Sequence, residues 1–156
     1  MKLDILAVGK NMPDWINTGV KEYLTRFPSQ LKTELVEVTP AKRSKTGLAE
    51  TYKREEAEHI LARIPLDNYV VALEVTGKTF DTPQLAKQLQ SWIGLSKNIS
   101  LIIGGPDGLD ASCIKRADLL WSLSPLTFPH PLVRVILVEQ LYRAWSLLNH
   151  HPYHRE

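Results

Sequence analysis

ISLIIGGPDG, residues 99–108, joins a mostly apolar run to a turn that holds three glycines and a proline. Ile99 to Ile103 reads as a strand, and no regular element accommodates the turn after Ile103. In open parallel α/β sheets, ligands bind beyond the carboxyl ends of the strands, so such a turn is a candidate site. We expect further strands and helices around this strand.

Strand and helix patterns alternate along the rest of the chain. The other predicted strands are residues 3–8, 35–38, 69–75 and 119–123. The predicted helices run from Pro13 to Pro28, over about 48–63, from a cap at Asp81, over 110–117 and over 131–148. This alternation predicts an α/β fold with a mostly parallel sheet, helices on both faces and a single domain over residues 1–156.

Local patterns give three more specific expectations. The segment Asn11-Met12-Pro13-Asp14 should cap the first helix. Thr76-Gly77-Lys78 should turn the chain after the strand that ends at Val75. The helix that begins at Asp81 should bury one apolar stripe, made of Leu85, Leu89, Trp92 and Ile93.

Composition places the chain among ordinary globular proteins. It has 156 residues, of which 44% are hydrophobic and 23% charged, so one domain can bury a core. The apolar run Leu3 to Val8 is too short for a signal peptide and contains Asp4, and no later run approaches the roughly 20 apolar residues of a membrane span. We expect a cytoplasmic protein without a membrane partner. The single cysteine, Cys113, predicts a buried, inert thiol and no internal disulfide.

The distribution of charge is more informative than its total. A net charge of +2 does not by itself indicate nucleic-acid binding. However, cations gather in one loop, at Lys42, Arg43 and Lys45, and again in the C-terminal tail, at His150, His151, His154 and Arg155. Either cluster could contact phosphate.

Two loops are candidate ligand sites. The glycine turn follows a strand and precedes a helix, as a phosphate loop does, but it lacks the G-x-G-x-x-G and Walker A patterns and also fits a plain tight turn. The second loop, Leu123 to Pro131, holds three prolines and is stiff. Its backbone groups could grip a flat heterocycle between Leu126 and Phe128, or it could be a rigid connector.

Candidate chemistry lies on the last helix and the tail. A histidine such as His130 can accept a proton near neutral pH or simply cap the helix, and Arg134 and Arg143 can hold phosphate by a forked contact. The tail combines cations with an aromatic ring at Tyr153, which suits stacking on bases but is also compatible with a solvated terminus. No carboxylate or cysteine cluster accompanies the tail histidines, so we expect no metal site.

The combination of these segments resembles the SPOUT class of methyltransferases. Within that class it is similar to the bacterial enzymes that methylate N3 of a pseudouridine in large-subunit (23S) ribosomal RNA. The resemblance covers essentially the whole chain and is carried by residues 6–10, LAVGK, residues 103–108, IGGPDG, residues 126–130, LTFPH, and residues 151–156, HPYHRE.

The resemblance implies a fold, a cofactor and a set of site residues. It implies a deep trefoil knot near the C-terminus and S-adenosylmethionine held at the strand ends. The implied cofactor-binding residues are Leu73, Gly104, Gly105, Gly108, Leu123, Ser124, Pro125, Leu126, Thr127 and Phe128. The implied residues for orienting the pseudouridine and its phosphates are His130, Arg143, Tyr153, His154 and Arg155.

The resemblance also implies partners. It points to a homodimer that uses the knotted end and the last helix, with the tail of one subunit completing the site of the other, and to ribosomal RNA in the assembled ribosome as substrate. Three alternatives stay open from the residues: a SPOUT methyltransferase acting on tRNA, a non-catalytic RNA-binding factor, and a flavodoxin-like nucleotide or flavin protein.

Overall fold

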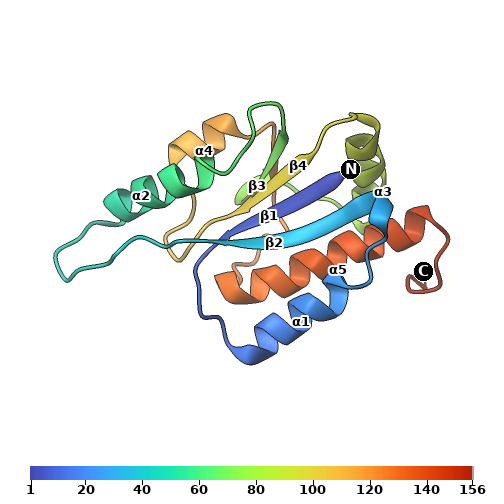
Figure 1. The fold of residues 1–156 in the computed structure, drawn as a ribbon, viewed down its shortest axis with the longest axis horizontal. Helices are drawn as coiled ribbons and strands as arrows, with labels where there is room; N and C mark the ends of the chain where they lie inside the picture. The colour runs from blue at the N-terminus through green and yellow to red at the C-terminus, as the bar shows by residue number, and fades with distance from the viewer. Residues whose placement is uncertain (156) are drawn as a thin grey trace.

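One parallel sheet forms the centre of the molecule (Figure 1). The computed structural model describes residues 1–155, so Glu156, which belongs to the tail segment named above, lies outside the described residues. Within residues 1–155 five strands pair in the order β2-β1-β4-β3-β5, and every strand pair is parallel. The strands are β1 Lys2–Val8, β2 Lys32–Val38, β3 Tyr69–Lys78, β4 Ile99–Ile103 and β5 Leu119–Trp121.

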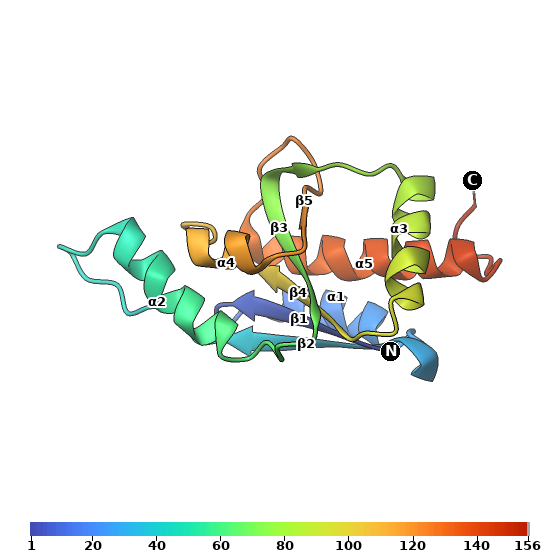
Figure 2. The ribbon, with the colours of Figure 1, turned by 90° about the horizontal axis from the view of Figure 1, so that it is seen from above.

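Helices cover both faces of this sheet, as the sequence predicted. Helices α2 and α4 lie on one face, and α1, α3 and α5 pack on the other (Figures 1 and 2). Their bounds are α1 Asp14–Leu24, α2 Ala49–Leu61, α3 Thr82–Gly94, α4 Ala111–Arg116 and α5 His130–Leu148, with a single 3-10 turn, η1 Ser29–Leu31, before β2. The α/β fold class is therefore confirmed.

Strand β4, residues 99–103, is the best-buried strand of the sheet. Every residue of β4 is buried, and β4 lies between β1 and β3. The larger core cluster fills the α1, α3 and α5 face and includes the fully buried Trp92. The smaller cluster lies under α2 and α4 and includes Cys113, whose thiol is buried as expected. Burial raises the pKa of that thiol to about 11, so it stays protonated at neutral pH.

Some local expectations are confirmed and others are wrong. Asp81 caps α3 as predicted, since it accepts from the backbone N–H of Gln84, and the Gln84 side chain accepts from the Asp81 N–H. The stripe on α3 is wrong at Ile93, which is 44% exposed because Trp92 already fills the space against the core. The predicted side-chain cap of the first helix is also wrong, because Pro13 takes that position and Asn11 adopts a left-handed turn.

Two strand ends also differ from the prediction. The residues Thr76 to Lys78 were expected to turn, but β3 runs on to Lys78, which pairs with Trp121 after an irregularity in the ladder. Strand β5 ends at Trp121 and not at Leu123, so the proline-rich loop begins two residues earlier. Both changes bring residues 74–78 and residues 122–124 to the same edge of the sheet.

No helix within residues 1–155 combines the length and apolar composition needed to cross a membrane.

We predict that Leu89→Ala lowers the free energy of unfolding by about 2–5 kcal/mol, because the Leu89 side chain is fully buried and its loss leaves a cavity. Urea denaturation of the purified protein measures this change. The matched control is Leu66→Ala, since Leu66 is 96% exposed and its truncation should change the free energy by less than about 0.5 kcal/mol. Equal effects of the two substitutions would contradict the assigned core.

Candidate functional site

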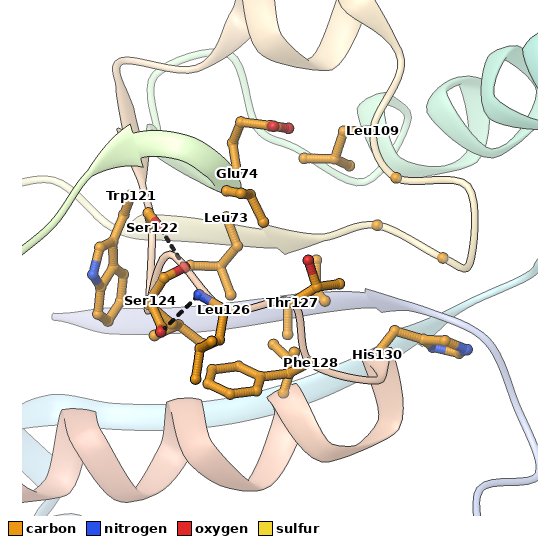
Figure 3. Close-up of a pocket in the computed structure, with 17 residues that line it drawn as sticks. Leu73, Glu74, Leu109, Trp121, Ser122, Ser124, Leu126, Thr127, Phe128 and His130 are labelled. Atoms are coloured by element: carbon orange, nitrogen blue, oxygen red, sulfur yellow. Dashed lines mark hydrogen bonds between the residues drawn. The ribbon is translucent and has the colours of Figure 1, made fainter.

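Three segments that follow strand ends meet in one cavity of about 210 Å³. They come from the end of β3, the turn after β4 and the loop after β5 (Figure 3). The start of α5 closes the cavity. The lining residues are Leu73, Glu74, Val75, Ile103, Gly104, Gly105, Gly108, Leu109, Trp121, Ser122, Leu123, Ser124, Leu126, Thr127, Phe128, His130 and Val133.

The glycine turn is a tight loop that accepts no side chain at its start. The Gly108 N–H donates to the carbonyl of Gly105 at 3.0 Å. A Cβ on Gly104 would lie 2.7 Å from the carbonyl carbon of Gly108, and Gly108 itself has a φ of +85°, where only glycine is unstrained. The sequence of this turn therefore sets the shape of one cavity wall.

The loop after β5 is held by its own serines. The Ser122 hydroxyl donates to the carbonyl of Ser124 at 3.0 Å, and the Leu126 N–H donates to the Ser124 hydroxyl at 3.0 Å (Figure 3). Of the residues predicted to bind a cofactor in this loop, Pro125 is exposed and does not line the cavity. The other five do line it, so the structure brings nine of the ten predicted cofactor-binding residues to one place.

The walls of the cavity are mostly apolar, with polar groups from the backbone. Leu73, Leu126 and Phe128 suit the faces of a flat heterocycle, and the strand ends offer N–H and C=O groups to its edge. Glu74 is the single carboxylate among the described lining residues. Its negative charge suits a ligand that carries a positive charge.

His130 is the first residue of α5 and lies at the border of the cavity, with its ring directed away from Leu126 and Phe128 (Figure 3). Burial lowers the pKa of His130 below its ordinary value, and the positive charges of Arg134 and Arg43 lower it further, against an opposing effect of Glu56. Its Nδ1 atom is buried and has no hydrogen-bond partner among the described residues. At neutral pH the ring is therefore uncharged and able to accept a proton.

Arg134 is not available for phosphate, contrary to the sequence prediction. Its side chain is 1% exposed and donates to Glu37 at 2.7 Å and to the carbonyls of Val8 and Gly9 at 3.3 and 3.0 Å. This buried guanidinium ties α5 to the carboxyl ends of β1 and β2. Its role is structural, since all these contacts lie within the fold.

The tail residues form a separate cluster at the other end of α5 (Figure 1). Arg143 donates through Nε to Glu139 at 2.9 Å, and the Tyr153 hydroxyl donates to the same carboxylate at 2.9 Å. Arg143 also lies over the Tyr153 ring, at 5.1 Å from the centroid. Burial, together with hydrogen bonds to Tyr23 and Glu139, raises the pKa of Tyr153, so it remains a neutral hydroxyl.

Within one chain these residues do not reach the cavity. His130 and Arg143 are separated along α5 by about 20 Å, at a rise of about 1.5 Å per residue. His154 is half-buried and Arg155 is exposed, both in the segment that follows the helix. The structure thus divides the five predicted substrate-orienting residues, with His130 at the cavity and the other four near the far end of α5.

Within residues 1–155, no group of three or more His, Cys, Asp or Glu residues is placed to hold a metal ion.

A family model described as "Predicted SPOUT methyltransferase" matches residues 1–154, which is nearly the whole chain. The chain belongs to the SPOUT methyltransferase family. This assignment agrees with the resemblance noted in the sequence. It makes the protein a methyltransferase of a family that uses S-adenosylmethionine and acts on RNA.

A solved structure with a similar fold is that of "a probable methylase family protein from Haemophilus influenzae Rd KW20". The TM-score is 0.58 at 11% sequence identity, and the alignment covers 99% of this chain and 70% of that chain. At this identity the likeness concerns the fold alone.

Sequence reasoning missed several residues of the SPOUT cavity. Glu74 and Val75 line the cavity directly after Leu73, but the turn predicted at residues 76–78 did not indicate them as ligand-binding residues. The predicted strand 119–123 places Trp121 and Ser122 in its middle, whereas β5 ends at Trp121 and Ser122 begins the loop. The available signal was position alone, since ligands bind beyond the carboxyl ends of parallel strands.

We predict that His130 titrates below its ordinary pKa of 6.5. Because the folded state binds this proton more weakly than the unfolded chain, the free energy of unfolding should fall as the pH drops through 6.5 towards the folded pKa. NMR titration of the imidazole signals, assigned with His130→Asn, measures the pKa. A midpoint at or above 6.5 would contradict the buried, uncharged ring.

We predict that Gly104→Ala raises the dissociation constant for S-adenosylmethionine by at least about tenfold, since the added Cβ must displace the backbone of Gly108 in the cavity wall. Isothermal titration calorimetry measures it. Gly94→Ala is the matched control, because a Cβ at the end of α3 meets no atom within 4 Å. Unchanged binding in a folded Gly104→Ala protein would place the cofactor elsewhere.

Proposed function

We propose that this protein transfers a methyl group from S-adenosylmethionine to N3 of a pseudouridine in 23S ribosomal RNA, within the assembled ribosome and in the cytoplasm. The observation that carries the proposal is the cavity in which the ends of β3, β4 and β5 meet beside His130. SPOUT family membership supports the donor and RNA as the substrate class, and the sequence resemblance supports the particular base.

The cavity residues fit the proposed cofactor. Leu126 and Phe128 would cover the flat adenine ring, and backbone groups along Leu123 to Phe128 would bind its polar edge. Glu74 would face the positively charged part of the molecule. When bound, S-adenosylmethionine supplies an electrophilic methyl group on a sulfonium centre. The chain's part is to hold the reacting atoms in line and to exclude water.

His130 is the proposed proton acceptor. Methylation of a ring N–H requires loss of its proton, and a group that accepts it must be uncharged beforehand. The lowered pKa of His130 leaves the ring uncharged at neutral pH, and its place at the cavity puts it near the donor site. The proton at N3 would pass to the imidazole as the new N–C bond forms.

The distance along α5 leads us to propose a homodimer in which each tail serves the partner's cavity. Arg143 and Tyr153 stand too far from His130 in their own chain to orient the same base. Apolar residues at the cavity mouth remain exposed, Leu126 by 69% and Val75 by 52%. A second copy that covers this face would bury them and bring its tail to the site. The expected trefoil knot near the C-terminus belongs to the same proposal.

The substrate proposal also uses the cationic surfaces. The basic loop after β2 projects from one end of the molecule, and the tail lies at the other (Figure 2). In a dimer that joins tail and cavity, these surfaces would contact phosphates on either side of the modified base. A single small domain offers little area for this, so the shape of the ribosome would supply much of the recognition.

The direct test is transfer of labelled methyl from S-adenosylmethionine to assembled ribosomes, separated subunits and bulk tRNA, followed by nucleoside analysis. We expect N3-methylpseudouridine in 23S RNA, with assembled ribosomes as the best substrate. Label found in tRNA alone would contradict 23S RNA as the substrate and indicate a SPOUT methyltransferase that acts on tRNA. Failure to bind S-adenosylmethionine would contradict the enzymatic proposal.

A mixed dimer tests whether the tail acts on the partner's cavity. We expect His130→Ala and Arg143→Ala to be inactive as homodimers, because each removes one half of the site. When the two are co-expressed and the heterodimer is purified with two tags, one cavity has both His130 and the partner's Arg143. Activity should return to about half that of the wild type. Without recovery, Arg143 does not act on the partner's cavity.

A further inference from the structure

The basic loop between β2 and α2 is held in one conformation by side chains of α2. Its backbone N–H groups donate to three of them at 2.8 to 3.2 Å. The pairs are Ala41 with Glu56, Lys42 with Glu55, and Ser44 with the Tyr52 hydroxyl. The loop is therefore a built element of the fold and not a loose cationic segment.

Within this loop Arg43 pairs with carboxylates elsewhere in the fold, although its side chain stays 35% exposed. Its guanidinium donates to Asp107 at 2.7 Å and to Glu56 at 3.3 Å, and it lies over the Tyr52 ring at 4.9 Å from the centroid. Lys42 and Lys45 are exposed on either side. One arginine thus joins two carboxylates from different parts of the chain, and the two lysines are left for other contacts.

Both carboxylates belong to, or touch, the glycine turn of the cavity. Asp107 is part of the turn but does not line the cavity. Glu56 is 2% exposed and lies directly behind Gly105, where an added Cβ would come within 3.2 Å of its Oε1 atom. Arg43 therefore binds the tip of the turn directly, through Asp107, and also pairs with the carboxylate that packs behind Gly105.

We propose that Arg43 is a positioning residue that holds the glycine turn of the methyl-donor cavity in its binding shape, through Asp107 and Glu56. This inference rests on the proposed donor function of that cavity. Arginine suits the task because its planar fork can bind two carboxylates at once, whereas a lysine ammonium cannot span both in the same way.

The charges of Arg43 and Glu56 also affect the pKa of His130. The positive charge of Arg43 lowers the pKa of His130, and the negative charge of Glu56 raises it. Without Arg43 the buried Glu56 carboxylate would keep the Ala41 N–H but lose its cationic partner beside the turn. Loss of Arg43 should thus change both the shape of the cavity wall and the pKa of His130.

The first measurement compares S-adenosylmethionine binding to the wild type and to Arg43→Ala by calorimetry. We expect a dissociation constant about tenfold higher in the variant, because Asp107 at the tip of the turn loses its ion pair and Glu56 behind Gly105 loses its cationic partner. Arg43→Lys should recover only part of the affinity. Arg63→Ala is the matched control, since Arg63 is exposed beyond the end of α2 and makes no side-chain contact of this kind within the described chain.

The second measurement needs no ligand and separates this inference from the proposed function. NMR titration of His130 in the free protein should show a higher pKa in Arg43→Ala than in the wild type, because a positive charge is removed and Glu56 is left unneutralised. Arg63→Ala should leave the pKa unchanged. If the wild type does not bind S-adenosylmethionine, the proposed function fails, and this titration still tests the placement of Arg43.

Asp107→Asn provides a variant that keeps the buried pair of Arg43 and Glu56 intact, should Arg43→Ala fail to fold. It removes only the charge at the tip of the turn, where the Asp107 side chain is 27% exposed. We expect a smaller rise in the dissociation constant, of about threefold. Unchanged S-adenosylmethionine binding in folded Arg43→Ala protein, or in folded Asp107→Asn protein where Arg43→Ala does not fold, would overturn the proposal.

Discussion

A buried guanidinium connects the sheet to the helix that begins at the site. Arg134 is almost wholly buried, and its hydrogen bonds go to Glu37 and to the carbonyls at the ends of β1. A buried charge is costly unless it is paired, so the bonds of the two terminal nitrogens of Arg134 favour the position in which α5 packs. That position places His130, one turn earlier, beside the cavity, and the Arg134 charge helps to keep the His130 ring neutral.

The glycine turn is fixed in a comparable way from the opposite face of the sheet. Arg43 reaches from the basic loop to Asp107 and Glu56, and these two carboxylates stand at the tip and behind the turn. The cavity therefore lies between two arginine clusters, one on each side of the sheet. Neither arginine lines it, so both act by placing the groups that do.

The features of the fold that were predicted correctly are those that depend on a few neighbouring residues. The apolar run of β4, the Asp81 cap and the glycines of the turn all followed from local rules and are confirmed as structure. Sequence reasoning failed where packing decided the outcome. Ile93 was assigned to the core, yet Trp92 occupies that space, and Arg134 was assigned to phosphate, yet it is buried among backbone carbonyls.

By itself, the sequence determined the α/β class and the alternation of helices and strands, because hydrophobic period, caps and glycine turns act over a few residues. The geometry of parallel sheets indicated the three loops that meet at the cavity, and the family followed from the resemblance of whole motifs. Only the tertiary structure decided which cations are free. Arg43 and Arg134 look alike in the sequence, but they pair with Asp107 and Glu37, carboxylates that lie far from them along the chain. It also decided that His130 and the tail stand at opposite ends of α5, since such distances depend on how whole elements pack.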